Sequence, residues 1–112
     1  MFTYVVLEHR GWIVQVDEPA VMSYEDMVGV VHGYIEPVYL DGAVAYVNEE
    51  GKLEGLPRNE RATALAHAHN AIYSDDWIAG NMLITGERDD EGEMMPLTNE
   101  WINANLKEIA NV

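Results

Sequence analysis

The sequence predicts an α+β fold: a single domain over residues 1–112 with a mixed or antiparallel sheet, arranged as a β-meander, and about three helices. Three observations predict it. Short runs with every second residue apolar are typical of half-buried strands. Three other segments join a capping residue to an apolar stripe at helical spacing. The 112 residues contain no repeat and no linker, which favours one core.

The first segments are predicted to be two strands. Tyr4–Leu7 and Trp12–Val16 are expected to pair around a turn at Arg10-Gly11. Glu18-Pro19 then ends this unit. The apolar face of the second strand is predicted to carry Trp12, Val14 and Val16.

A helix is predicted to begin after Ser23. Ser23 can cap the first turn, and Asp26 stands three residues later, as in a capping box. Gly33 is expected to end this helix in the left-handed conformation. The inner stripe is predicted to hold Tyr24, Met27, Val28 and Val31.

The middle of the chain is predicted to be rich in strands. Residues 34–40 and 43–47 flank Asp41-Gly42, a pair that favours a two-residue hairpin turn. Pro37 lacks an N–H group and is therefore expected at a sheet edge or a bulge. A second turn at Glu50-Gly51 is expected to return the chain through Lys52-Leu53, which would continue the meander.

The C-terminal half is predicted to hold two more helices. Asn59 is expected to cap the first of them. A strand over 81–85 and a mobile acidic loop over 86–96 are expected to follow, and then a C-terminal helix over 98–110 that Thr98 caps. The inner stripe of the helix after Asn59 is predicted to hold Ala62, Leu65, Ala66 and His69.

The charge limits the classes of partner. Acidic residues outnumber basic ones by 20 to 6, and the formal net charge is −14. This charge repels nucleic acid and anionic lipid, so we expect no direct nucleic-acid binding and no membrane association. The N-terminal run lacks the basic flank and the apolar length of an export signal or a membrane span, so a cytoplasmic protein is expected.

No catalytic constellation is recognisable, and we expect a non-enzymatic protein with no cofactor and no metal. The absence of cysteine excludes thiolate sites. His67 and His69 are two positions apart, which on a helix turns them about 200° from each other. His69 is therefore expected to be a hydrogen-bonded core residue, with His67 facing solvent. Carboxylate-based hydrolysis stays open as an enzymatic alternative.

One group of basic residues suggests an anion site. Lys52, Arg58 and Arg61 are three of the six bases, and two of them bracket the predicted helix start at Asn59. The first-turn amides and the helix dipole favour an anion there. The hypothesis is a nucleotide-like phosphate bound by Lys52, Arg58, Asn59, Arg61 and Thr63. The alternative is that Asn59 caps the helix, that Thr63 bonds within the helix and that the arginines balance neighbouring acids.

Three segments resemble a known family. The quoted residues are Gly33-Tyr34-Ile35-Glu36, then Asn48-Glu49-Glu50-Gly51-Lys52-Leu53 continuing through Gly55-Leu56-Pro57, Asn59 and Ala62-Thr63, and finally Ile78-Ala79-Gly80-Asn81-Met82-Leu83. They resemble DUF3846, a domain of unknown function that recurs in bacteriophages and in bacteria, notably actinobacteria. The resemblance covers roughly residues 1–85 and implies a small accessory protein of phage or mobile-element type. It carries over no catalytic residue.

Two functions follow as hypotheses. The first is an acidic accessory protein that binds a host protein and modulates or inhibits it. The host protein could be one that handles nucleic acid, in which case the acidic surface would mimic the charge of the phosphate backbone. The alternative is the capture of the nucleotide-like ligand described above. A homodimer through Trp77, Trp101, Met94 and Met95 is a further hypothesis. The candidate partner-binding residues are Asp89, Asp90, Glu91 and Glu93.

Overall fold

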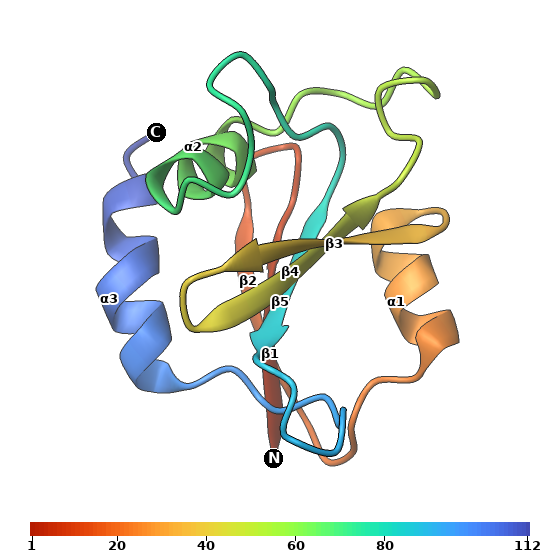
Figure 1. Cartoon of the computed structure of the whole chain (residues 1–112), viewed down its shortest axis with the longest axis vertical. Helices are drawn as coiled ribbons and strands as arrows, with labels where there is room; N and C mark the ends of the chain where they lie inside the picture. The colour runs from red at the N-terminus through yellow and green to blue at the C-terminus, as the bar shows by residue number, and fades with distance from the viewer.

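The computed structural model describes residues 1–112 as a five-stranded antiparallel sheet with helices on both faces (Figure 1). The strand order is β2-β1-β5-β4-β3. The predicted α+β class, the antiparallel sheet and the three helices are confirmed. No helix combines the length and the apolar character needed to span a membrane. In chain order the elements are β1 (Phe2–Leu7), β2 (Ile13–Glu18), α1 (Tyr24–Val31), β3 (Ile35–Leu40), β4 (Ala43–Asn48), α2 (Glu60–Ala68), β5 (Met82–Gly86) and α3 (Asn99–Ile109).

The first hairpin is confirmed with one correction. β1 pairs with β2 in a register that sets Leu7 opposite Ile13, so the turn takes in residues 8–12. Trp12 therefore lies in the turn, outside the strand, and 66% of its surface is exposed. The prediction that Trp12 shares the half-buried face of β2 was wrong, because the turn is longer than the sequence pattern indicated.

The capping box predicted for α1 is confirmed, but the residue that ends the helix is not the predicted one. The Ser23 side chain accepts from the Asp26 N–H, and the Asp26 carboxylate accepts from the Ser23 N–H. The left-handed residue at the other end is His32, with φ of 64°, rather than Gly33. Gly33 is needed for space, since a Cβ there would lie 2.6 Å from the Nδ2 atom of Asn48.

The second hairpin is confirmed, but the meander is not. β3 and β4 pair across Asp41-Gly42, and Pro37 lies in β3 at the edge of the sheet, as expected. No strand passes through Lys52-Leu53, which lie in an irregular turn. β5 takes the place beside β4 because all five of its residues are buried, which suits the centre of a sheet covered on both faces.

The sheet separates two apolar cores. On one face, α2 and α3 cover β1, β4 and β5, and their shared core includes Val5, Ala45 and Leu65. On the other face, α1 packs through Met27 and Val31 onto a smaller cluster. Figure 1 shows α1 on the side of the sheet opposite α2 and α3. Tyr24, predicted on the inner stripe of α1, is exposed, because only one side of this short helix meets the sheet.

Side chains of α2 and α3 hold the tip of the second hairpin. The Nε1–H group of Trp101 donates to the Asp41 carbonyl at 2.7 Å, and the Asp41 N–H donates to Nδ1 of His69 at 2.9 Å. Nε2 of His69 therefore carries the proton and donates to Oδ1 of Asn105 at 3.0 Å. The predicted hydrogen bonding of His69 is confirmed, but the residue is half-buried at the C-terminal end of α2 and not part of the core. Trp101 is only 8% exposed, so it does not belong to an open dimer surface as the sequence suggested.

The acidic segment over 86–96 is folded into a hydrogen-bonded turn. The Asp89 carboxylate accepts from the N–H groups of Glu91 and Glu93, each at 2.9 Å. The guanidinium of Arg88 donates to the Gly92 carbonyl at 2.9 Å. The mobility expected for this segment stays a prediction. The helix expected after it is confirmed, with the Thr98 hydroxyl accepting from the Trp101 N–H at 3.1 Å.

Replacement of Asn59 by Ala should be among the most destabilising single changes in the fold. Asn59 is 1% exposed, caps α2 through the Ala62 N–H and donates to the carbonyls of Leu7 and Gly80. We expect Asn59→Ala to lower the free energy of unfolding by about 3 kcal/mol, since it leaves two buried carbonyls unpaired as well as an open helix end. Urea unfolding measures this. Thr98→Ala, which removes a cap alone, should cost about 1 kcal/mol, and equal losses in the two variants would contradict the interpretation.

Candidate functional site

The candidate site is a turn with a hollow on each side of it. Residues 49–54, named here the 49–54 turn, leave β4 and project from the end of the sheet. One hollow, of about 290 Å³, lies between this turn and residues 72–79. The other, of about 510 Å³, lies between the turn and the start of α1. Asn48 and Glu50 line both hollows, so the turn forms the wall between them.

Asn48 fixes the shape of this turn. Its buried amide donates to the carbonyls of Val31 and His32 at the end of α1, at 3.3 and 3.2 Å. The same amide group donates to the Glu54 carboxylate at 2.9 Å, and its oxygen accepts from the Glu50 N–H at 2.8 Å. One side chain thus connects β4, the end of α1 and both ends of the turn.

The backbone of the turn also lies close to the segment that follows α2. A Cβ at Gly51 would stand 2.9 Å from the Ala79 carbonyl oxygen, so only glycine allows this approach. The Gly51 carbonyl accepts from the Leu56 N–H at 2.9 Å. The turn is therefore a preformed surface, and binding there costs little ordering of the backbone.

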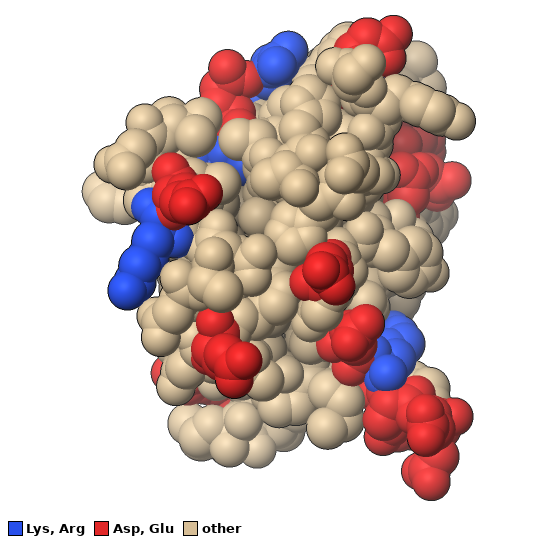
Figure 2. All heavy atoms as spheres, turned by 60° about the vertical axis from the view of Figure 1, so that its left-hand side comes forward, with Lys and Arg blue, Asp and Glu red and all other residues tan.

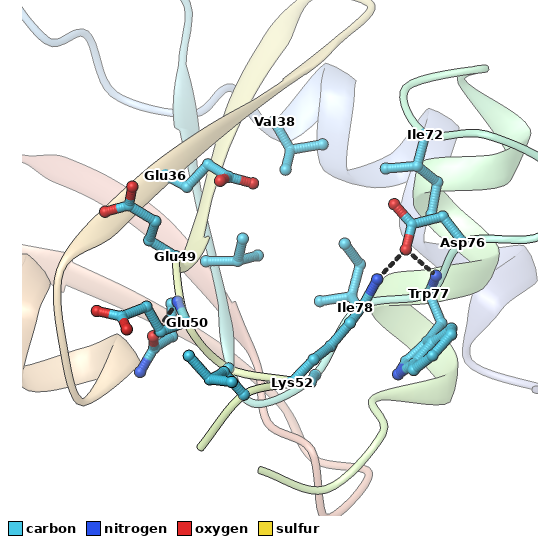
Figure 3. A pocket seen from close by; sticks show the side chains of 14 residues that line it. Glu36, Val38, Glu49, Glu50, Lys52, Ile72, Asp76, Trp77 and Ile78 are labelled. Atoms are coloured by element: carbon cyan, nitrogen blue, oxygen red, sulfur yellow. Dashed lines mark hydrogen bonds and ion pairs between the residues drawn. The ribbon is translucent and has the colours of Figure 1, made fainter. Parts of the chain in front are cut away.

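The smaller hollow, named here the tryptophan hollow, combines an apolar floor with charged walls. Val38, Val47 and Ile78 belong to the buried core and form the floor. Figure 3 shows Glu36 and Glu49 on the wall opposite Asp76, with Lys52 reaching across to the Asp76 carboxylate. Trp77 lines the far side, and 38% of its surface is exposed.

An ammonium group of the chain itself already lies in this hollow. The Nζ atom of Lys52 pairs with the Asp76 carboxylate and lies 4.2 Å from the centre of the Trp77 ring. The hydrogen bond from Lys52 lowers the pKa of Asp76; partial burial acts in the opposite direction, and the Trp77 N–H adds to the lowering. In this hollow, therefore, a carboxylate and an aromatic ring together hold a cation, the ammonium group of Lys52.

The larger hollow, named here the tyrosine hollow, has similar groups but no cation. Its wall carries two exposed rings, Tyr24 at the start of α1 and Tyr34 just before β3. Carboxylates come from Glu25 on α1 and from Glu50 and Glu54 of the turn. No lysine or arginine is among the lining residues. The hollow is therefore negatively charged, aromatic and open to solvent.

The five residues predicted to bind a phosphate do not surround one hollow. Asn59 and Thr63 are buried and committed to the fold, and the Thr63 hydroxyl accepts from the Ile78 N–H at 2.9 Å. Arg61 donates to the carbonyls of Gly11 and Ala110. The Asn59 cap fits the structural alternative weighed for the same residues, whereas Thr63 bonds outside α2 and Arg61 bonds backbone carbonyls instead of a neighbouring acid.

The two remaining bases of that prediction meet at Trp77. Arg58 pairs with Glu60, and its guanidinium carbon lies 6.0 Å from the centre of the Trp77 ring. Lys52 lies nearer the same ring, paired with Asp76 as described above. A phosphate ligand at these residues stays a prediction.

The two neighbouring histidines turn to different partners. Nε2 of His67 lies 2.9 Å from the Asp76 carbonyl, whereas both ring nitrogens of His69 bond toward the hairpin tip and α3. His67 is half-buried through this contact, so the expectation that it faces solvent was wrong. The predicted partner-binding residues Asp89, Asp90, Glu91 and Glu93 lie together in their own exposed turn, outside both hollows.

Sequence reasoning missed the tyrosine hollow and the role of Asn48. Tyr24 was assigned to the buried stripe, and Tyr34 to a strand, so neither was expected beside a turn carboxylate. The available signal was the run from Asn48 to Leu53, in which glycine and three carboxylate or amide side chains fall inside a resemblance to a known family. This signal indicated the right segment, but it did not indicate that the segment forms a turn between two hollows.

Comparison with protein families identifies the chain's relatives. Residues 3–110 match the family described as a domain of unknown function, DUF3846. The chain belongs to this family. The DUF3846 match runs through the acidic turn and α3, which corrects the expectation that the family covers only roughly residues 1–85. No curated protein and no solved structure matches the chain.

The Asp76 pair should make stability depend on pH in acid. Because the pKa of Asp76 is lowered in the folded state, its contribution is present above the ordinary value of 3.8 and is lost as the pH falls through the lower folded value. Asp76→Asn should lower the melting temperature by about 1 to 3 °C at pH 7, in the range of a partly exposed pair. The difference from the unmodified protein should shrink toward zero as the pH falls below 3.8 and through the lower folded pKa.

Melting curves over this pH range measure the effect. Asp75→Asn is the matched control, because Asp75 is exposed and neighbours the pair without taking part in it. A deficit of Asp76→Asn that stays constant with pH would contradict the pairing.

The phosphate hypothesis makes a separate prediction. If a nucleotide binds at the start of α2, a panel of adenine, guanine and cyclic nucleotides should contain one that raises the melting temperature. Arg61→Ala should abolish that rise. The absence of any shift across the panel would end the hypothesis.

Proposed function

We propose that this DUF3846 domain is a non-enzymatic binding protein whose partner is a protein with basic side chains on its surface. The contact surface is the 49–54 turn with its two hollows. In the phage setting that the family resemblance implies, the partner is a protein of the host, including one that handles nucleic acid. Occupation of its basic surface would modulate or inhibit that protein.

The distribution of ion pairs is the observation that carries the proposal. Only three of the twenty acidic residues, Glu8, Glu60 and Asp76, form ion pairs within the chain. Three of the six bases are used in these pairs, and Arg61 and Arg88 donate to backbone carbonyls. Most basic groups are thus neutralised or engaged internally, while most carboxylates remain available to a partner.

The spacing of the acids supports a local contact. On the face in Figure 2, acidic side chains stand apart, with uncharged side chains between them, except near the lower right, where several gather beside a basic one. Such spacing supports recognition of a few basic residues more than imitation of a continuous phosphate backbone. At the 49–54 turn, by contrast, carboxylates stand next to exposed aromatic rings, which are enriched at protein interfaces.

Binding of a basic peptide tests the proposal. The probe is a fluorescent ten-residue peptide rich in arginine and lysine, followed by anisotropy at low and at physiological salt. Replacement of Glu49, Glu50 and Glu54 by Gln should raise the Kd about tenfold, because three close carboxylates lose their charge. Glu54→Gln keeps an oxygen that can accept from Asn48, so the turn should retain its shape.

The matched control removes the same charge elsewhere. Replacement of Asp90 by Asn and of Glu91 and Glu93 by Gln should change the Kd less than about twofold. Equal weakening in both triple variants would show that net charge alone attracts the peptide, which would contradict the proposal. Weakening in the second variant alone would assign the contact to the acidic turn over 86–96 instead. The absence of peptide binding would also refute it.

A further inference from the structure

We infer that the tyrosine hollow is a pocket for an arginine side chain of the partner. This inference rests on the proposed function and names the group that the surface recognises. The hollow is lined by Tyr24 and Tyr34 and by three acidic residues, Glu25, Glu50 and Glu54.

Size and composition indicate an organic cation. The hollow, at about 510 Å³, is within the range of sites that take a side chain or a small molecule. No group of three His, Asp or Glu side chains in the chain is arranged to hold a metal ion. An organic cation that carries several N–H donors can bond to more than one carboxylate and lie against an aromatic ring at the same time.

Glu54 is the best-positioned acceptor in the hollow. Its Oε1 atom accepts from the buried amide of Asn48 at 2.9 Å, which fixes the carboxylate before any ligand arrives. That bond leaves the Oε2 atom available to a donor, since no other hydrogen bond to the Glu54 carboxylate forms within the chain. A fixed carboxylate loses less side-chain entropy on binding than a free one.

The aromatic rings favour arginine over lysine. Tyr34 is 69% exposed and Tyr24 is 54% exposed, so both present ring surface that a planar group can cover. A guanidinium stacks on aromatic faces, donates in parallel to carboxylates and is more weakly hydrated than an ammonium. A lysine ammonium can satisfy the charge but not the stacking.

The tryptophan hollow supplies an internal comparison. There, an ammonium of the chain itself lies between a carboxylate and an aromatic ring, in the contact of Lys52 with Asp76 and Trp77. The tyrosine hollow offers the same two kinds of group on the other side of the 49–54 turn, and no base of the chain occupies it. A cation from outside the chain fits this position.

Titration with single amino-acid derivatives tests the inference without any partner protein. The probes are N-acetyl-arginine amide, its lysine counterpart and its neutral isostere N-acetyl-citrulline amide, followed by amide chemical shifts in NMR spectra. We expect the arginine probe to shift Gly33, Tyr34, Glu50 and Glu54 with a Kd in the low millimolar range. The lysine probe should bind at least about threefold more weakly, and the citrulline probe should give no saturable shift.

Two substitutions and two controls complete the test. Tyr34→Ala and Glu54→Gln should each raise the Kd for the arginine probe about threefold to tenfold, whereas Tyr34→Phe should leave it nearly unchanged. Tyr39→Ala removes an equally exposed ring outside the hollow and should have no effect. Unchanged spectra outside the hollow would show that each variant is folded.

The possible results separate this inference from the proposed function. No shift at these residues up to about 50 mM arginine probe would overturn the pocket, as would equal binding of citrulline or of lysine. If the basic peptide still binds through the 49–54 turn in that case, the proposed function stands and the arginine pocket fails. If the arginine probe binds here but the peptide does not bind at all, the pocket stands and the proposed function fails.

Discussion

The candidate site depends on the hydrogen bonds made by the side chain of Asn48. Buried amide groups must be hydrogen-bonded, and this one is bonded through both its nitrogen and its oxygen. Its partners belong to α1, to the Glu50 backbone and to the Glu54 side chain. Gly33 is required because the amide passes so close to it. The position of α1 and the shape of the 49–54 turn are therefore set by the same residue, and the tyrosine hollow between them is a product of that arrangement.

Basic and acidic side chains have different roles in this fold. Five of the six bases pair with acids or donate to backbone carbonyls, so they stabilise local structure. The many acids stay in water, where isolated carboxylates cost nothing in burial. A surface built this way attracts basic partners over a distance and repels nucleic acid and anionic lipid. In the proposed function, specific contact depends on the places where carboxylates stand beside aromatic rings, as they do around the 49–54 turn.

Local signals predicted most of the fold, and long-range contacts account for the errors. Ser23, Asn59 and Thr98 each cap the helix assigned to them, because capping is decided within four residues. The expected strand through Lys52-Leu53 failed because the place beside β4 belongs to β5, some thirty residues later, which no local pattern can indicate. The left-handed residue is His32, and the glycine next to it instead gives room to the side chain of Asn48, which comes from β4. The two hollows are formed by contacts between segments that are distant in the sequence, so they were harder to predict than the helices and strands.

The central place of β5 has a consequence for how the chain is made. β1 and β2 can pair early, and so can β3 and β4, because each pair is joined by a short connection. The two hairpins share no strand contact until Met82–Gly86 enters between them. During synthesis both hairpins therefore keep one strand edge, with its backbone N–H and C=O groups, unpaired until the ribosome has released this last strand. Nascent chains that stall before this point would be the species most exposed to chaperones and to aggregation.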